Sequence, residues 1–108
     1  APNEKIALEH VLNYPNPFTT NTRFEFEHNR PNQPIDVSIN ILTVSGRVIK
    51  RIHQKVITEG FRVQNQIHWN GLDDYGDKIG KGVYIYSVTI RDSKGETANK
   101  FEKLVLLQ

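Results

Sequence analysis

The sequence predicts an all-β fold, an immunoglobulin-like β-sandwich of about seven antiparallel strands. The first observation is a period-two alternation: Ile35, Val37, Ile39 and Ile41 are separated by polar residues. Such alternation places one face of a strand on a core and the other in solvent. The second is that proline, glycine or asparagine interrupts nearly every long run, so no stretch keeps a helical apolar spacing over three turns. About seven short strands separated by turn residues are typical of a sandwich.

The strands and turns are expected in the following places along the chain. A polar, mobile linker at residues 1–5 precedes a first strand near residues 6–12. Leu42 and Val44 break the alternation described above, which predicts a β-bulge or a strand end. Turn residues at 45–47 join the third and fourth strands as a hairpin. The other strands are expected at residues 22–28, 47–57, 63–69, 83–91 and 97–107, and the other turns and loops at 29–34, 70–82 and 92–95.

Composition excludes several classes of protein. The 108 residues suit one domain, and 37% apolar residues suffice for a modest core. Without cysteine the chain has no disulfide, thiolate metal site or cysteine nucleophile. A formal charge of +2 gives no reason to expect nucleic acid as a partner. No membrane-spanning apolar run and no signal peptide are found, and the first residue is Ala1, so we interpret the sequence as a mature form or a piece of a longer protein.

The polar residues form no recognisable catalytic or metal-binding motif. Asp73, Asp74 and Asp77 are a candidate for calcium, but they lack the spacing of an EF-hand loop and suit consecutive turns. No paired histidine motif and no GxSxG nucleophile motif occur. We therefore expect no catalytic residue, no metal and no cofactor. The four histidines are expected at solvent-facing strand positions: His10, His28, His53 and His68.

The aromatic residues near the end of the chain allow two interpretations. Trp69, Tyr84 and Tyr86 would form a platform for a sugar or a peptide if their rings faced solvent. Aromatic residues on sandwich strands more often pack in the core or on a sheet face, which is the expectation here. The exposure of the rings distinguishes a binding module from a packed core.

The last strand is unusual because it is apolar almost to the final residue, whereas chain termini usually fray. One explanation is a buried central strand. Another is an edge strand that presents one face to a partner, donates backbone hydrogen bonds to another sheet, or exchanges between two copies in a dimer. The apolar residues concerned are Leu104, Val105, Leu106 and Leu107.

Five segments together resemble one family. They are Tyr14-Pro15-Asn16-Pro17-Phe18 with Thr19, Thr22 and Phe24; residues 37–44 with Ser45-Gly46-Arg47-Val48; Trp69-Asn70-Gly71 with Asp73, Asp74 and Gly76; Gly82-Val83-Tyr84-Ile85-Tyr86; and residues 100–107. They are similar to the type A C-terminal sorting domain of the type IX secretion system of the Bacteroidota, which is related to the Ig-like domain of the flagellar hook-capping protein. The resemblance implies a division into residues 1–13, the linker and first strand, and residues 14–108, the sorting domain.

The resemblance also implies a non-catalytic domain that is recognised rather than one that reacts. Such a domain directs a passenger fused before it from the periplasm through the outer-membrane translocon to the sortase and attachment proteins. The passenger then resides at the outer membrane or cell surface or is secreted. Sortase cleavage of a cargo signal is expected in or upstream of residues 1–13, whereas a system component such as the sortase would retain the domain.

The roles of individual residues follow from the motifs. Pro15 and Pro17 are expected to fix an extended entry segment, Phe18 and Trp69 to support the fold, and Gly46 to serve the hairpin turn. Two alternatives remain open: a surface adhesion or carbohydrate-binding module, and an accessory domain that only stabilises an attached enzyme. The residues expected to carry or support recognition are Gly82, Tyr84, Lys100, Lys103, Leu104, Val105, Leu106 and Leu107.

Overall fold

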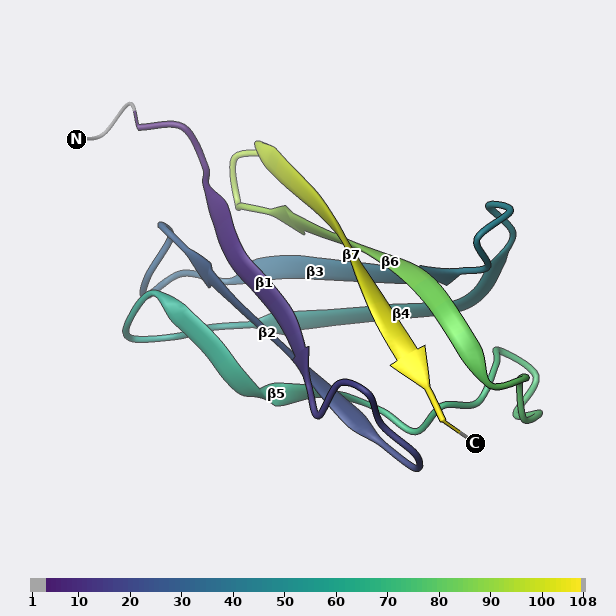
Figure 1. The fold of residues 1–108 in the computed structure, drawn as a ribbon. Helices are drawn as coiled ribbons and strands as arrows, with labels where there is room; N and C mark the ends of the chain where they lie inside the picture. The colour runs from purple at the N-terminus through teal and green to yellow at the C-terminus, as the bar shows by residue number, and fades with distance from the viewer. Residues whose placement is uncertain (1–3, 108) are drawn as a thin grey trace.

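The chain forms, in a computed structural model that describes residues 4–107, seven strands in two facing sheets (Figure 1). All strand pairs are antiparallel. The described residues contain no helix, and hence none that is long and apolar enough to cross a membrane. The all-β, Ig-like fold class is therefore confirmed. The strands are β1 (Leu8–Tyr14), β2 (Thr22–His28), β3 (Ile35–Leu42), β4 (Val48–Val56), β5 (Arg62–Trp69), β6 (Gly82–Arg91) and β7 (Thr97–Leu106).

The order of the strands places β7 at an edge. One sheet has the order β1-β2-β5 and the other has the order β4-β3-β6-β7. The first strand begins and ends two residues later than expected, and the other strands lie where the alternation predicts them. A register shift between Ile41 and Leu42 confirms the predicted bulge. Of the two explanations for the last strand, the structure supports the edge strand over the central one.

The core lies between the sheets and is built from alternate residues of both. Phe24 of β2 and Tyr86 of β6 pack edge to face, with ring centroids 5.0 Å apart. Trp69 and Tyr86 are buried and Tyr84 is half-buried, which confirms the core interpretation of the aromatic residues. Burial, together with the nearby carboxylate of Glu102, raises the pKa of Tyr86 above its usual range. These rings consequently stabilise the contact between the sheets and form no exposed platform.

The segment before β1 is held to the sandwich, which corrects the expectation of a mobile linker for Glu4 and Lys5. The guanidinium of Arg30 donates a hydrogen bond of 2.7 Å to the carbonyl of Glu4, and the amide of Asn29 donates one of 2.7 Å to the carbonyl of Lys5. The backbone N–H of Ala7 donates to the Asn29 side chain at 2.8 Å. Residues 1–3 of the expected linker lie outside the described residues.

Arg30 is itself positioned by a buried carboxylate. Its Nε donates to Asp92 at 3.0 Å, and the backbone N–H groups of Lys94 and Glu96 donate to the same carboxylate at 2.9 and 3.0 Å. Burial alone would raise the pKa of Asp92, but these hydrogen bonds and the charge of Arg30 together lower it. The turn between β6 and β7 and the chain entering β1 are thus joined at one end of the sandwich.

His28 is buried, so the expectation of a solvent-facing position is wrong for this histidine. The reason is strand parity, because His28 has the same parity on β2 as the buried residues Phe24 and Phe26. Its Nδ1 accepts the N–H of Arg30 at 3.0 Å, and its Nε2 lies 2.8 Å from the hydroxyl of Thr58. Burial lowers the pKa of the ring. The other three histidines, His10, His53 and His68, are exposed as expected.

Acidification is expected to destabilise the fold through His28. Because its pKa in the folded chain lies below the ordinary value of 6.5, the unfolded chain binds a proton more readily. The free energy of unfolding therefore stays constant above pH ~6.5 and decreases as the pH falls below it, until the folded chain also binds the proton. Urea unfolding between about pH 7.5 and about pH 5.5 measures this decrease. His28→Gln should lose the decrease and His53→Gln should keep it; equal pH dependence in both variants would contradict the account.

Candidate functional site

The outer edge of β7 is covered at its C-terminal end by the segment that follows β1. The side-chain amide of Asn16 acts on β7 as a neighbouring strand would: its Nδ2 donates to the carbonyl of Lys103 at 3.1 Å, and its Oδ1 accepts the N–H of Val105 at 3.0 Å. The N–H of Phe18 donates to the carbonyl of Val105 at 3.0 Å, and its carbonyl accepts the N–H of Leu107 at 2.9 Å. We call Asn16 and Phe18 the β7 cover.

The β7 cover occupies the edge that the sequence offered to another sheet. From the carbonyl of Lys103 to the N–H of Leu107, the outer backbone groups already have hydrogen-bond partners within the chain. The possibility that this part of the strand donates hydrogen bonds to a partner is therefore wrong for the folded domain, because covered edges do not add a strand. Towards the start of β7, the outer backbone groups of Thr97, Asn99 and Phe101 have no partner among the described residues.

The ring of Phe18 fixes the β7 cover to the core. Phe18 is buried, and its ring centroid lies 5.6 Å from that of Trp69. Gly71 approaches both Phe18 and Leu106: a Cβ there would lie 3.5 Å from the Phe18 ring and 3.9 Å from the Leu106 side chain. Its φ of +79° also favours glycine. The first, third and last of the five family segments therefore meet around one aromatic ring.

The long loop between β5 and β6 is held by the remaining motif residues. The indole N–H of Trp69 donates to the carbonyl of Leu72 at 2.8 Å, and the hydroxyl of Tyr84 donates to the carbonyl of Gly80. Gly82 begins β6 with a φ of +142°, and Gly46 has a φ of +97° in the hairpin turn. These positions agree with the structural parts expected for Trp69 and Gly46. They also place Tyr84 and Gly82 in support of the loop rather than on an exposed face.

Pro15 and Pro17 do not form the extended segment that was expected. Both peptide bonds that precede them are cis, and residues 15–17 form a bend. The physical reason is that the chain must pass from β1 in one sheet to the edge of β7 in the other. An extended segment would continue past that edge, whereas the bend places Asn16 against the backbone of β7.

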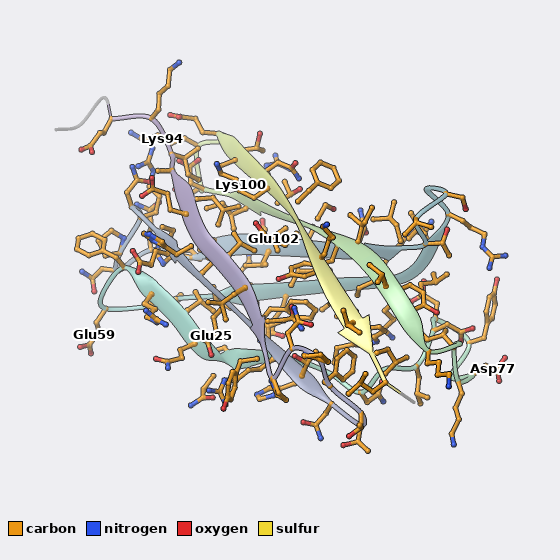
Figure 2. All side chains as sticks on the ribbon, in the orientation of Figure 1. Glu25, Glu59, Asp77, Lys94, Lys100 and Glu102 are labelled. Carbon is orange, nitrogen blue, oxygen red and sulfur yellow. The ribbon has the colours of Figure 1, made fainter. Side chains whose placement is uncertain are left out.

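The side chains expected to carry recognition lie on different sides of β7. Leu104 and Leu106 are buried in the core, whereas Val105 is half-buried and Leu107 is 55% exposed. Strand alternation puts Lys103 on the outer face of the sheet, away from the core. Lys100 has the opposite parity, and together with Glu102 it lines a groove beside β1 (Figure 2). The structure therefore does not bring Lys100 and Lys103 together.

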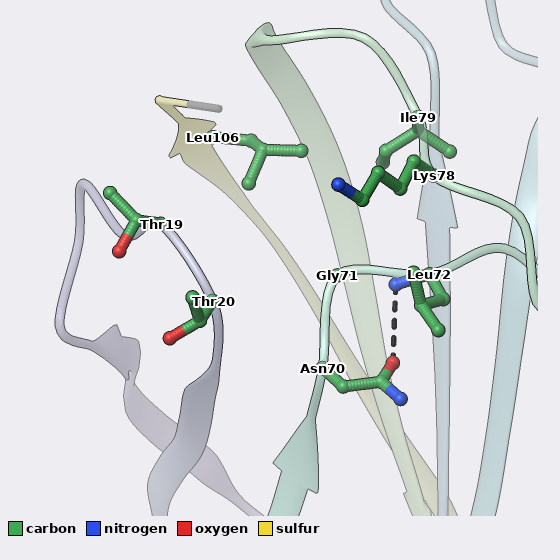
Figure 3. A pocket seen from close by; sticks show the side chains of 8 residues that line it. All are labelled: Thr19, Thr20, Asn70, Gly71, Leu72, Lys78, Ile79 and Leu106. Carbon is green, nitrogen blue, oxygen red and sulfur yellow. Dashed lines mark hydrogen bonds between the residues drawn. The ribbon is translucent and has the colours of Figure 1, made fainter.

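A shallow pocket of about 280 Å³ adjoins the end of β7 (Figure 3). Apolar side chains and two threonines form most of its wall, and Lys78 is the one charged residue that lines it. The side-chain oxygen of Asn70 accepts the N–H of Leu72 at 3.1 Å, which fixes one side of the pocket. Such a lining suits contact with a partner and supplies no general acid or base. The lining residues are Thr19, Thr20, Asn70, Gly71, Leu72, Lys78, Ile79 and Leu106.

The acidic loop uses its carboxylates for turns, as expected. One oxygen of Asp73 accepts the N–H groups of Tyr75 and Asp77, both at 2.9 Å. Asp74 accepts the N–H of Arg51 at 3.1 Å and donates its own N–H to the carbonyl of Ile49 at 3.0 Å, so it covers the edge of β4. Within residues 4–107 no three histidine, aspartate or glutamate side chains gather as metal ligands would.

Sequence reasoning missed the contact of Asn16 with β7, that of Asp74 with β4, and those of Asn29 and Arg30 with the segment before β1. Asn16 lies between two prolines, which cannot donate backbone hydrogen bonds, so its side chain is the polar group that this motif offers. That signal was available in the sequence. The interactions of Asn29 and Arg30 join residues more than 20 positions apart, and no local sequence pattern predicts them.

The fold and the covered terminal strand define an Ig-like β-sandwich domain. The family described as "Secretion system C-terminal sorting domain" matches residues 13–105. The chain belongs to this family, the C-terminal sorting domains of type IX secretion. The signal implies export of the protein that carries it to the outer membrane, the cell surface or the medium. The family also favours a non-catalytic part for the domain.

Two solved structures resemble the chain. A latent, dimeric PorU from Porphyromonas gingivalis matches with a TM-score of 0.81 and 25% identity, over 96% of this chain and 10% of the PorU chain. FlgD from Xanthomonas campestris, which is involved in hook capping, matches with a TM-score of 0.61 and 18% identity, over 94% of this chain and 68% of the FlgD chain. The likeness to FlgD concerns the fold alone. No curated protein sequence matches the chain.

Asn16→Ala is expected to destabilise the domain by about 1–2 kcal/mol, because two backbone groups of β7 lose their partner. Asn21→Ala is the matched control. Asn21 is also exposed, and its amide donates only to the hydroxyl of Thr20, at 3.5 Å, so its loss should cost less than about 0.5 kcal/mol. Urea unfolding of both variants makes the comparison. Equal stabilities would show that the β7 cover contributes nothing.

Replacing Leu106 should lower the free energy of unfolding much more than replacing its neighbour Leu107. Leu106 is 3% exposed and Leu107 is 55% exposed. Leu106→Ala is expected to cost about 2–5 kcal/mol through the cavity it leaves, whereas Leu107→Ala should cost less than about 0.5 kcal/mol. Thermal and urea unfolding of the two variants measure the difference. A loss at Leu107 as large as that at Leu106 would contradict the burial pattern.

Proposed function

We propose that the domain acts as a folded signal that carries a passenger from the periplasm through the type IX outer-membrane translocon to the sortase and attachment proteins. The observation that supports this most directly is the convergence of the family segments on one structure, the C-terminal half of β7 with its cover. A signal read as a folded module needs such a rigid and defined end. The edge of β7 is covered there, so side chains rather than free backbone groups carry the recognition.

The passenger joins the domain at the other end of the sandwich. The chain enters near Glu4, and the N–H of Ile6 lies 3.4 Å from the carboxylate of Glu96, which follows the turn between β6 and β7. Figure 1 shows the two termini at opposite ends of the molecule. The point of attachment thus lies at the opposite end of the sandwich from the C-terminal end of β7.

The residues that the sequence singled out form two groups: some contact a partner and the others support the fold. Lys103, Val105 and Leu107 present side chains to a partner, because they are exposed or half-buried near the end of β7. Leu104 and Leu106 act through the core, which keeps the strand in place. Gly82 and Tyr84 fix the neighbouring loop. Lys100 contributes only if a partner also reaches the groove beside β1.

In cargo proteins the sortase removes the domain by cutting before β1. The chain is protected from cleavage from Leu8 onward, because β1 pairs with β2 there, so the cut lies before this residue. Residues 4–7 are held by Asn29 and Arg30, and ordered, hydrogen-bonded backbone resists proteolysis. In a component of the machinery the same domain would be retained. Both fates use the same fold.

The other two functions are less well supported. The carbohydrate-binding alternative depended on an exposed row of aromatic rings, and Trp69 and Tyr86 are buried. The accessory-domain alternative predicts that loss of the domain lowers the stability of an attached enzyme without affecting its export. An export assay separates that alternative from the proposed function.

A fluorescent protein that carries a periplasmic signal peptide, fused before residues 1–108, is expected to reach the cell surface or the medium in a host with a type IX system. The same passenger without the domain should stay in the periplasm. A second control that ends at residue 96 lacks β7 and should also stay there. Cell fractionation and protease accessibility measure the outcome. Periplasmic retention of a folded, full-length fusion would refute the proposed function.

A further inference from the structure

The outer face of the four-stranded sheet has an apolar half at the C-terminal end. Cross-strand pairing places Ile85 of β6 between Leu42 of β3 and Lys103 of β7, and Val83 opposite Val105. These positions alternate with buried residues, so their side chains point away from the core. Val83 is 47% exposed and Phe101 is 62% exposed. We call this surface the outer patch: Leu42, Val48, Val83, Ile85, Phe101 and Val105 with Lys103 among them.

The other half of the same face is polar. Asp36 pairs with Arg91 across β3 and β6, and Ser38 pairs with Thr89. Asp36 also lies 3.8 Å from the ammonium group of Lys55. One face of one sheet thus changes from charged and hydroxyl groups to aliphatic ones along its length. Contiguous exposed apolar surface of this kind marks a place of contact in soluble domains.

The charged residue within the outer patch is a cation, although Asp73 and Asp74 line a pocket with Arg47 and Val48 at its β4 side. Lys103 lies within it, and Arg47 and Lys81 flank it, directly before Val48 and two residues before Val83. Within residues 4–107 none of these three cations forms an ion pair with a carboxylate. A partner that is apolar at the centre and bears carboxylates around it would complement this surface.

The passenger is not the partner that the outer patch fits. The chain enters the domain beside Glu96, at the end of the sheet where β6 terminates in Arg91. The eight-residue step from Arg91 back to Val83 corresponds to about 26 Å along the strand. A passenger is therefore tethered at the polar end, and the outer patch faces a partner in trans at the other end.

We propose that the outer patch is the docking face for a protein of the export machinery whose own surface is apolar and bordered by carboxylates. This inference rests on the proposed function. It adds which face of the domain makes the contact and what kind of partner surface fits that face. Contact spans β3, β6 and β7 and is not limited to the C-terminal residues. Lys103 sets the orientation by charge, and the aliphatic side chains around it supply the buried area.

The test compares Ile85→Glu with Thr89→Glu in the full-length fluorescent fusion. The two positions lie on the same strand and the same face, four residues apart, with only Ile85 in the outer patch. Ile85→Glu should lower the exported fraction at least about tenfold, because a carboxylate enters the apolar contact and neutralises Lys103, which lies opposite it. Thr89→Glu should stay within about twofold of the wild type. Thermal unfolding of the purified domains establishes that both variants fold.

Further variants test the inference if Ile85→Glu does not fold. The double variant Val83→Thr and Ile85→Thr preserves β-branching and strand preference and should also lose export. Lys103→Glu should lose export and Lys100→Glu, on the opposite face of β7, should retain it. Normal export of the folded outer-patch variants, with a wild-type fusion that is exported, would overturn the inference and leave the proposed function intact. A wild-type fusion that is not exported would overturn both.

Two further outcomes would assign the outer patch to a different occupant and so overturn the inference. Sedimentation of the purified domain as a dimer that Ile85→Glu converts to a monomer would identify a second copy of the chain. Flotation of the domain with vesicles of anionic phospholipid, lost in Lys103→Glu, would identify a lipid surface. The inference expects a monomer that does not float with these vesicles.

Discussion

The hydrogen bonds that Asn16 and Phe18 make to the backbone of β7, from the carbonyl of Lys103 to the amide of Leu107, are the interaction on which this domain depends. They close the edge of the sheet at the point where the chain ends. They also tie the three-stranded sheet to the four-stranded one, because the covering segment continues directly from β1. An open edge there would leave a terminal strand free to fray or to pair with other chains. Because the edge is closed, the C-terminal end of β7 is a rigid surface.

The opposite edge of the four-stranded sheet, at β4, is covered in a similar way. Asp74 donates its N–H to the carbonyl of Ile49 and accepts the N–H of Arg51, so an irregular loop covers β4 as the β7 cover closes β7. With both edges covered near this end, strand addition is blocked and the side chains of the sheet face remain available. This arrangement suits a module that is read as a folded unit while it carries passengers of differing shape.

The sequence predicted the strands well because apolar and polar residues alternate and turn residues follow, most cleanly in β3. The first strand was placed two residues early because Ile6 packs against the core without belonging to a strand, whereas buried Asn13 belongs to β1. Strand parity would have predicted the burial of His28, which its polar character obscured. The sequence could mark the Asn16 side chain as the polar group between two prolines, but not its contact with β7, which joins residues nearly 90 positions apart.

Amide hydrogen exchange along β7 tests the central claim most directly. The N–H groups of Val105 and Leu107 are hydrogen-bonded by the β7 cover, whereas those of Asn99 and Phe101 point to the same outer side and have no partner among the described residues. The account predicts slow exchange at Val105 and Leu107 and fast exchange at Asn99 and Phe101. Equally fast exchange at all four amides would show that the cover does not hold the terminal strand, and would contradict the account.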